Sequence, residues 1–106
     1  MTDTIVVTTT LDKKEDAVHL AKLLLQKRLI ACAQVSGPVD SLYWWKGEIE
    51  QAQEYKLLMK STQSLWDRLK EAIKEQHPYD IPEIISMEIS AVNTEYQTWL
   101  LEELQQ

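Results

Sequence analysis

The single cysteine, Cys32, and one histidine, His77, have side chains that bind soft metal ions. A soft metal ion bound by Cys32, and a metal ion or another ligand contacted by His77, are the functional hypotheses. Structural roles are the alternatives. Cys32 lies between two alanines in a strand-like stretch, where a cysteine commonly serves as a small buried hydrophobe. His77 precedes a proline at the end of a helical pattern, where it can cap the helix.

The remaining candidates for chemistry are aromatic or acidic. Tyr43, Trp44 and Trp45 are consecutive and form either a stacking platform for a ligand or a surface that packs against protein, and packing is the favoured interpretation. The carboxylates of Glu48, Glu50 and Glu54 lack the spacing of a calcium loop, so a solvated acidic edge is expected.

Enzymatic chemistry is not indicated by any motif. The sequence has no glycine loop for phosphates and no Ser/His/Asp set. An acid/base role for His77 with Lys60 or Glu83 is the remaining enzymatic alternative, and it requires a group that titrates near neutral pH. His19 falls on the polar side of a predicted helix and is expected to be solvated.

Length and composition limit the classes of protein. With 106 residues and a formal net charge of −6, the chain predicts one domain over residues 1–106 and disfavours nucleic-acid binding. No apolar run approaches the roughly 18 residues of a membrane span, and the first residues do not resemble a signal peptide. One cysteine excludes an internal disulfide, so we expect the reducing cytoplasm.

Hydrophobic periodicity predicts the elements that position these side chains. Asp12, with Glu15 three residues later, is the expected cap of the first helix. Gly37-Pro38 is expected to form a bulge or bend inside a long hairpin. The predicted strands are 4–10, 30–36 continuing at 39–45, 54–60 and 83–89, with a turn at 46–48; the predicted helices run from 12 to about 29, from 62 to 76, and onward from 93 or 94.

The order β-α-β-β-α-β plus a terminal helix is typical of a ferredoxin-like α+β fold. Right-handed crossovers place the two main helices on one face of an antiparallel four-stranded sheet. Only the short last helix is left to cover the other face.

The central hairpin is too long for a globule of this size. Fifteen strand residues at roughly 3.3 Å each span about 50 Å, whereas a 100-residue globule has a radius of gyration of about 13 Å. The aromatic tip must therefore overhang the domain or curl over it. Overhanging arms with apolar tips commonly pack against a neighbouring subunit, so we expect a homo-oligomer.

Four segments resemble the CutA divalent-cation tolerance family: 28–33 (RLIACA), 41–51 (SLYWWKGEIEQ), 58–61 (LMKS) and 77–84 (HPYDIPEI). The resemblance implies a ferredoxin-like subunit in a compact homotrimer similar to the PII signalling proteins, with the hairpins wrapping neighbours. It also implies a non-enzymatic role in tolerance to divalent metals, copper in particular.

The resemblance also suggests which residues form sites. Cys32 and His77 are the implied ligands of a weak site for Cu²⁺ or another divalent cation, and no organic cofactor is implied. A PII-like signalling module that binds a small effector between subunits is the alternative function. The residues implied for that intersubunit cleft are Tyr43, Trp45, Lys60, Tyr79 and Glu83.

Overall fold

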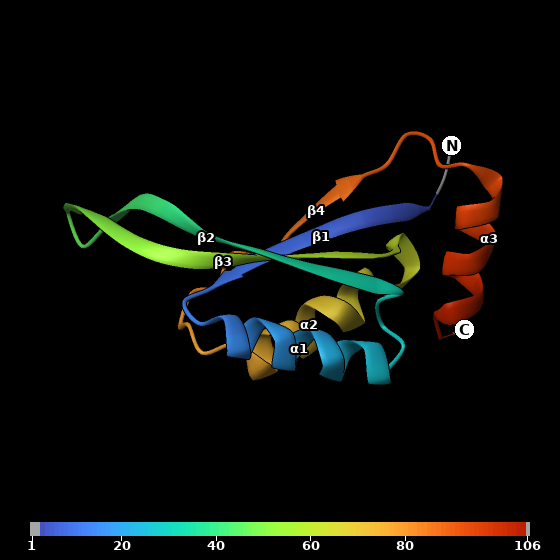
Figure 1. The fold of residues 1–106 in the computed structure, drawn as a ribbon, viewed down its shortest axis with the longest axis horizontal. Coiled ribbons are helices and arrows are strands. Elements are labelled where there is room, and N and C mark those ends of the chain that lie inside the picture. Colours follow the sequence, from blue (N-terminus) through green and yellow to red (C-terminus); the bar gives the residue numbers. More distant parts are fainter. Residues whose placement is uncertain (1–2, 106) are drawn as a thin grey trace.

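The computed structural model describes residues 3–105; the first two residues and the last residue of the predicted 1–106 domain lie outside this range. Within it, strands and helices follow one another along the chain in the predicted order (Figure 1). The elements are β1 (Thr4–Leu11), α1 (Lys14–Gln26), β2 (Cys32–Trp45), β3 (Glu48–Thr62), the 3₁₀ turn η1 (Gln63–Leu65), α2 (Trp66–Gln76), β4 (Ile85–Glu88) and α3 (Thr94–Glu103). No helix among these residues is long and apolar enough to cross a membrane.

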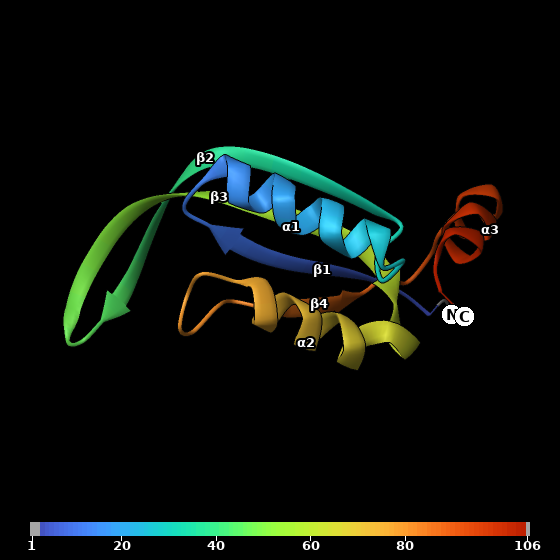
Figure 2. The same ribbon diagram turned by 90° about the horizontal axis from the view of Figure 1, so that it is seen from below.

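The four strands of the described chain form one sheet in the order β2-β3-β1-β4, and every neighbouring pair is antiparallel. Both α1 and α2 lie against one face of this sheet, and α3 stands at one end of it (Figures 1 and 2). The predicted α+β architecture, the antiparallel four-stranded sheet and the order of the elements along the chain are confirmed. We call the sheet face opposite α1 and α2 the open face.

Alternation along β1 determines which side chains reach the core. Ile5 and Val7 point toward the helices and are fully buried, as are Met59, opposite Val7, and Leu57, opposite Thr9, on β3. Each such side chain contributes on the order of 1.5–3 kcal/mol by leaving water. Residues of the other parity face the open side, where Ile85 and Met87 of β4 each remain 49% exposed.

Beyond the core, β2 and β3 continue as an arm (residues 39–54) that extends away from the body (Figure 2). The molecule is accordingly elongated, with extents of 45 × 26 × 23 Å. The pairing register shifts between Ser36 and Val39, which confirms the bulge predicted at Gly37-Pro38. The predicted turn is also confirmed, with Lys46 and Gly47 both at positive φ.

The ends of α1 differ from the prediction. Lys13, not Asp12, occupies the N-cap position, and no side chain caps the helix. The helix ends at Gln26, short of Leu29. It ends there because Arg28 adopts a left-handed backbone with φ 56°, and the amides of Arg28 and Leu29 turn back to the carbonyls of Leu25 and Leu24.

The limits of two strands also differ from the prediction. β3 begins six residues before the predicted strand, because the tight turn pairs the strands from Trp45 and Glu48 onward. β4 is only four residues long, whereas seven were predicted. Only Ile85–Glu88 pair with β1, so residues 83, 84 and 89 lie outside the strand.

Candidate functional site

Cys32 opens β2 on the open face, directly opposite Lys60 of β3. Its Sγ lies 3.4 Å from the hydroxyl oxygen of Tyr96 and 3.8 Å from Nζ of Lys60. Lys60 Nζ also lies 5.7 Å from the centroid of the Tyr96 ring. The hydrogen bond with Cys32, then burial, raises the pKa of Tyr96 to about 12. We call these three residues the thiol cluster; it places a half-buried thiol between a cation and a phenol.

His77 ends α2 and is 8% exposed. Its Nδ1 accepts a hydrogen bond of 3.1 Å from the backbone amide of Tyr79. Its Nε2 lies 2.9 Å from the carbonyl oxygen of Thr10 and 3.1 Å from Oγ1 of Thr9. A nitrogen that accepts carries no hydrogen, so the ring is the tautomer with its proton on Nε2, which donates to the Thr10 carbonyl.

The charge state of His77 follows from this environment. Burial is the largest effect and lowers the pKa of His77 below its ordinary value. The Thr10 carbonyl and the nearby carboxylates of Glu54 and Asp12 oppose the shift without cancelling it. The neutral imidazole is therefore the form that this packing favours.

Tyr79 connects His77 to the root of the arm. Its hydroxyl donates to Oε2 of Glu54 at 2.7 Å, and its ring packs edge-on against that of His77, with 4.8 Å between centroids. Burial and Glu54 raise the pKa of Tyr79 well above its usual range. Burial alone would raise the pKa of Glu54, but hydrogen bonds from Ser41, Tyr79 and Thr10 outweigh it and lower that pKa.

The two predicted metal ligands lie on opposite faces of the sheet. Cys32 is opposite Lys60, which is opposite Val6, and these three share the open face. Thr9, which touches the His77 ring, has the other parity and points toward the helices. Residues 3–105 also contain no group of three or more His, Cys, Asp or Glu placed to hold a metal ion. One chain therefore does not bring Cys32 and His77 to a common ion.

The predicted cleft residues also lie apart from one another within one chain. Tyr43 is opposite Glu50 on the arm, ten residues along β3 from Lys60, which corresponds to about 33 Å. Trp45 lies still farther out, at the turn. Glu83 is exposed in the loop before β4. Their grouping between subunits remains a prediction.

Glu54 and Tyr96 are site residues that sequence reasoning missed. Glu54 was expected on a solvated acidic edge, but it is 8% exposed, so that expectation was wrong for this residue. No local spacing signals its partner Tyr79, which is 25 residues away. Tyr96 lies in α3, and its contact with Cys32 spans 64 residues.

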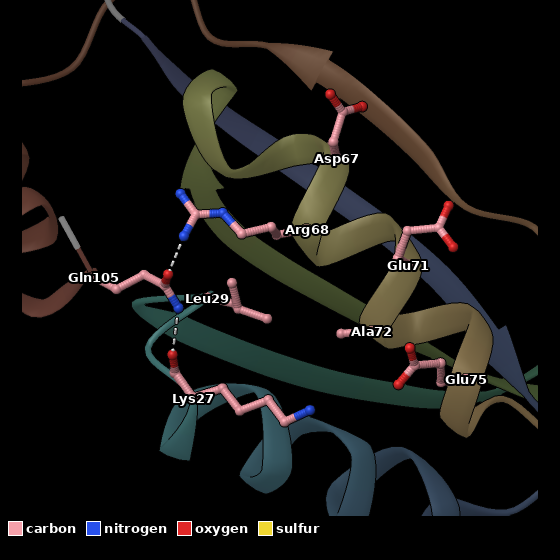
Figure 3. Close-up of a pocket in the computed structure, with 8 residues that line it drawn as sticks. All are labelled: Lys27, Leu29, Asp67, Arg68, Glu71, Ala72, Glu75 and Gln105. Carbon is pink, nitrogen blue, oxygen red and sulfur yellow. Dashed lines mark hydrogen bonds between the residues drawn. The ribbon is translucent and has the colours of Figure 1, made fainter.

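A groove of about 600 Å³ lies between the end of α1 and α2 (Figure 3). Leu29 and Ala72 form part of its lining, and the side chain of Gln105 bridges Arg68 and the carbonyl oxygen of Lys27. The residues that line it are Lys27, Leu29, Asp67, Arg68, Glu71, Ala72, Glu75 and Gln105. It is therefore separate from both the thiol cluster and His77.

Comparison with known proteins gives a consistent result. A family model described as "CutA1 divalent ion tolerance protein" matches residues 5–103. A divalent-cation tolerance protein CutA of Pyrococcus horikoshii is 46% identical over 93% of this chain and 96% of its own length. A chloroplastic CutA protein of rice is 38% identical over 91% of this chain and 54% of its length. The crystal structure of CutA1 from P. horikoshii superposes with a TM-score of 0.92 at 43% identity, covering 96% of this chain and 99% of that one.

Proposed function

We propose that this chain, which belongs to the CutA1 divalent ion tolerance family, acts in tolerance to divalent cations, including copper, as a non-enzymatic cytoplasmic homotrimer. The family match along nearly the whole chain is the observation that carries the metal-tolerance part. The cytoplasmic part rests on the single free cysteine, which suits a reducing compartment.

The trimeric part is supported by apolar surface that one chain leaves in water. Leu42, Trp44 and Ile49 are 65%, 72% and 64% exposed on one face of the arm. The open face adds Ile85 and Met87. Clusters of large exposed apolar side chains commonly mark interfaces. A homotrimer would cover both the arm and the open face with copies of the same chain.

Weak Cu²⁺ binding in this proposal is a property of the assembly. A single chain offers Cys32 beside Lys60 and Tyr96, which is one soft ligand and no complete shell. Because Cys32 lies on the open face, ligands from neighbouring subunits would complete its coordination.

Calorimetric titration with Cu²⁺ tests the role of Cys32, with Cys32→Ser as the variant. We expect the variant to keep its mass by light scattering and to lose at least about ten-fold in Cu²⁺ affinity, since even indirect support of a metal ligand is worth that much. Superimposable isotherms would remove Cys32 from the proposal.

An effector-binding module is the second candidate. It is favoured by the exposed aromatic side chains of Tyr43 and Trp45, which would line a cleft against a neighbouring subunit. A ligand bound there would raise the melting temperature in proportion to its concentration. A broad metabolite screen without any such shift would count against this candidate.

A further inference from the structure

We propose that His77 and Tyr79 form a lock that fixes the direction of the arm, and that His77 serves this lock instead of coordinating a divalent cation. The lock is a property of one chain. Only its consequence for assembly rests on the proposed trimer.

The first argument is the use of both ring nitrogens of His77. A neutral imidazole has one nitrogen lone pair to offer a metal, and here that lone pair on Nδ1 already accepts the Tyr79 amide at 3.1 Å. The other nitrogen bonds to the Thr10 carbonyl at 2.9 Å. A metal ion would have to displace one of these bonds within a buried site.

The second argument is the donor set around the ring. Cys32 lies across the sheet, and the described residues offer no cluster of three His, Cys, Asp or Glu. The groups that face His77 come from the end of β1, from the arm root and from its own loop: the Thr9 hydroxyl, the Thr10 backbone carbonyl, and the side chains of Asp12, Glu54 and Tyr79. This environment does not fit a divalent cation in one chain.

The third argument is what the same contacts do for the arm. The Tyr79 hydroxyl holds Glu54, and Glu54 is opposite Val39 in the first pair beyond the bulge. The side chains of Ser41 and Thr10 also favour the charged form of the Glu54 carboxylate and lower its pKa. The hydrogen bond from Tyr79 to Glu54 thus joins the root of the arm to the body.

The bulge itself lies against the same point. A Cβ built on Gly37 would lie 3.0 Å from the carbonyl oxygen of Glu54 and 3.0 Å from the ring of Tyr55. The bend of β2 therefore lies directly beside Glu54, the residue of β3 that the lock holds. Because the arm is long, a small rotation at this root displaces its apolar tip by several ångströms.

Amide hydrogen exchange of residues 39–53 in the full chain tests the lock. Tyr79→Phe removes only the hydroxyl that holds Glu54. We expect arm exchange to accelerate by roughly ten-fold or more, since hydrogen bonds to charged groups are among the stronger ones. Tyr55→Phe removes a hydroxyl from the neighbour of Glu54 on β3. It is the matched control and should leave the exchange of the arm unchanged.

Cu²⁺ titration of His77→Gln tests the second half of the proposal. We expect arm exchange to rise in this variant while Cu²⁺ affinity stays within about two-fold of the wild type. If the arm of Tyr79→Phe exchanges like that of the wild type, the lock is overturned. A ten-fold loss of Cu²⁺ affinity in His77→Gln overturns the claim that His77 does not coordinate the ion.

If Tyr79→Phe does not fold, Glu54→Gln should show the same acceleration of arm exchange, and the absence of that acceleration would be equally decisive. A monomeric protein would refute the trimer and still allow the exchange comparison.

Discussion

His77 and Glu54 are ionisable side chains that this fold buries with partners. Burying a polar group without a hydrogen bond costs several kcal/mol in the least favourable cases. The structure avoids this cost by giving His77 the Tyr79 amide and the Thr10 carbonyl, and by giving Glu54 the Tyr79 hydroxyl. The result is a neutral imidazole close to a charged carboxylate.

This arrangement predicts a loss of stability in acid. Burial lowers the pKa of His77 from its ordinary value of 6.5, so just below that pH the unfolded chain binds more protons than the folded one. The contribution is complete above 6.5 and is lost as the pH falls through the folded pKa. Glu54, whose pKa is lowered from 4.5, adds a second loss at more acidic pH.

Urea unfolding at about pH 8 and about pH 5.5, at one protein concentration, measures the first of these losses. The wild type should be less stable at the lower pH, and His77→Gln should show a smaller decline. Equal declines in both proteins would contradict the assignment to His77.

Sequence reasoning located the individual site residues better than their partners. It singled out Cys32, His77 and Tyr79 from their types and from motif resemblance. It could not predict that Cys32 meets Tyr96 or that Tyr79 meets Glu54, because these contacts join residues 64 and 25 positions apart. Long-range contacts of this kind depend on the folded packing and leave no local pattern.

At the scale of elements, the β2–β3 hairpin depends on its two glycines in different ways. Gly47 has φ 83° at the turn, and a Cβ there would meet open space. Gly37 has φ 137° at the bulge, where a Cβ would crowd backbone atoms of β3. The cost of a side chain is therefore conformational at the turn, and both conformational and steric at the bulge.

Alanine substitution should separate these two costs. We expect Gly47→Ala to lower the free energy of unfolding by about 1 kcal/mol, the usual penalty for a left-handed backbone. Gly37→Ala should cost more, at about 2 kcal/mol or above, because β3 must shift as well. Thermal unfolding of the two variants shows which one loses more stability. If Gly37→Ala lost no more than Gly47→Ala, the steric role of the arm root would be contradicted.

The identity and order of the elements could be predicted because the patterns are strong. Ile5 and Val7, then Leu57 and Met59, alternate as half-buried strands do, and the structure buries all four. Helix ends were less predictable. The first helix stops at Gln26 because Arg28 takes a left-handed backbone, a conformation that glycine adopts more readily and that no residue type signals here.

At the scale of the whole molecule, the chain buries one core and leaves a second apolar surface uncovered. The core lies between the sheet and α1 and α2, while Leu42, Trp44 and Ile49 on the arm remain in water. This asymmetry is the physical basis of the proposed trimer. Because α3 stands at one end of the sheet, it leaves the open face uncovered (Figure 1).

Light scattering on the purified full-length protein at micromolar concentration tests this account most directly. We predict a folded species of three times the 12.3 kDa chain mass, and a shift toward smaller species when the apolar arm face is made polar by Trp44→Ser. Lys46→Ala, next to the tip, is the control and should keep the assembly. A wild-type protein that remains folded at 12.3 kDa would contradict the central claim.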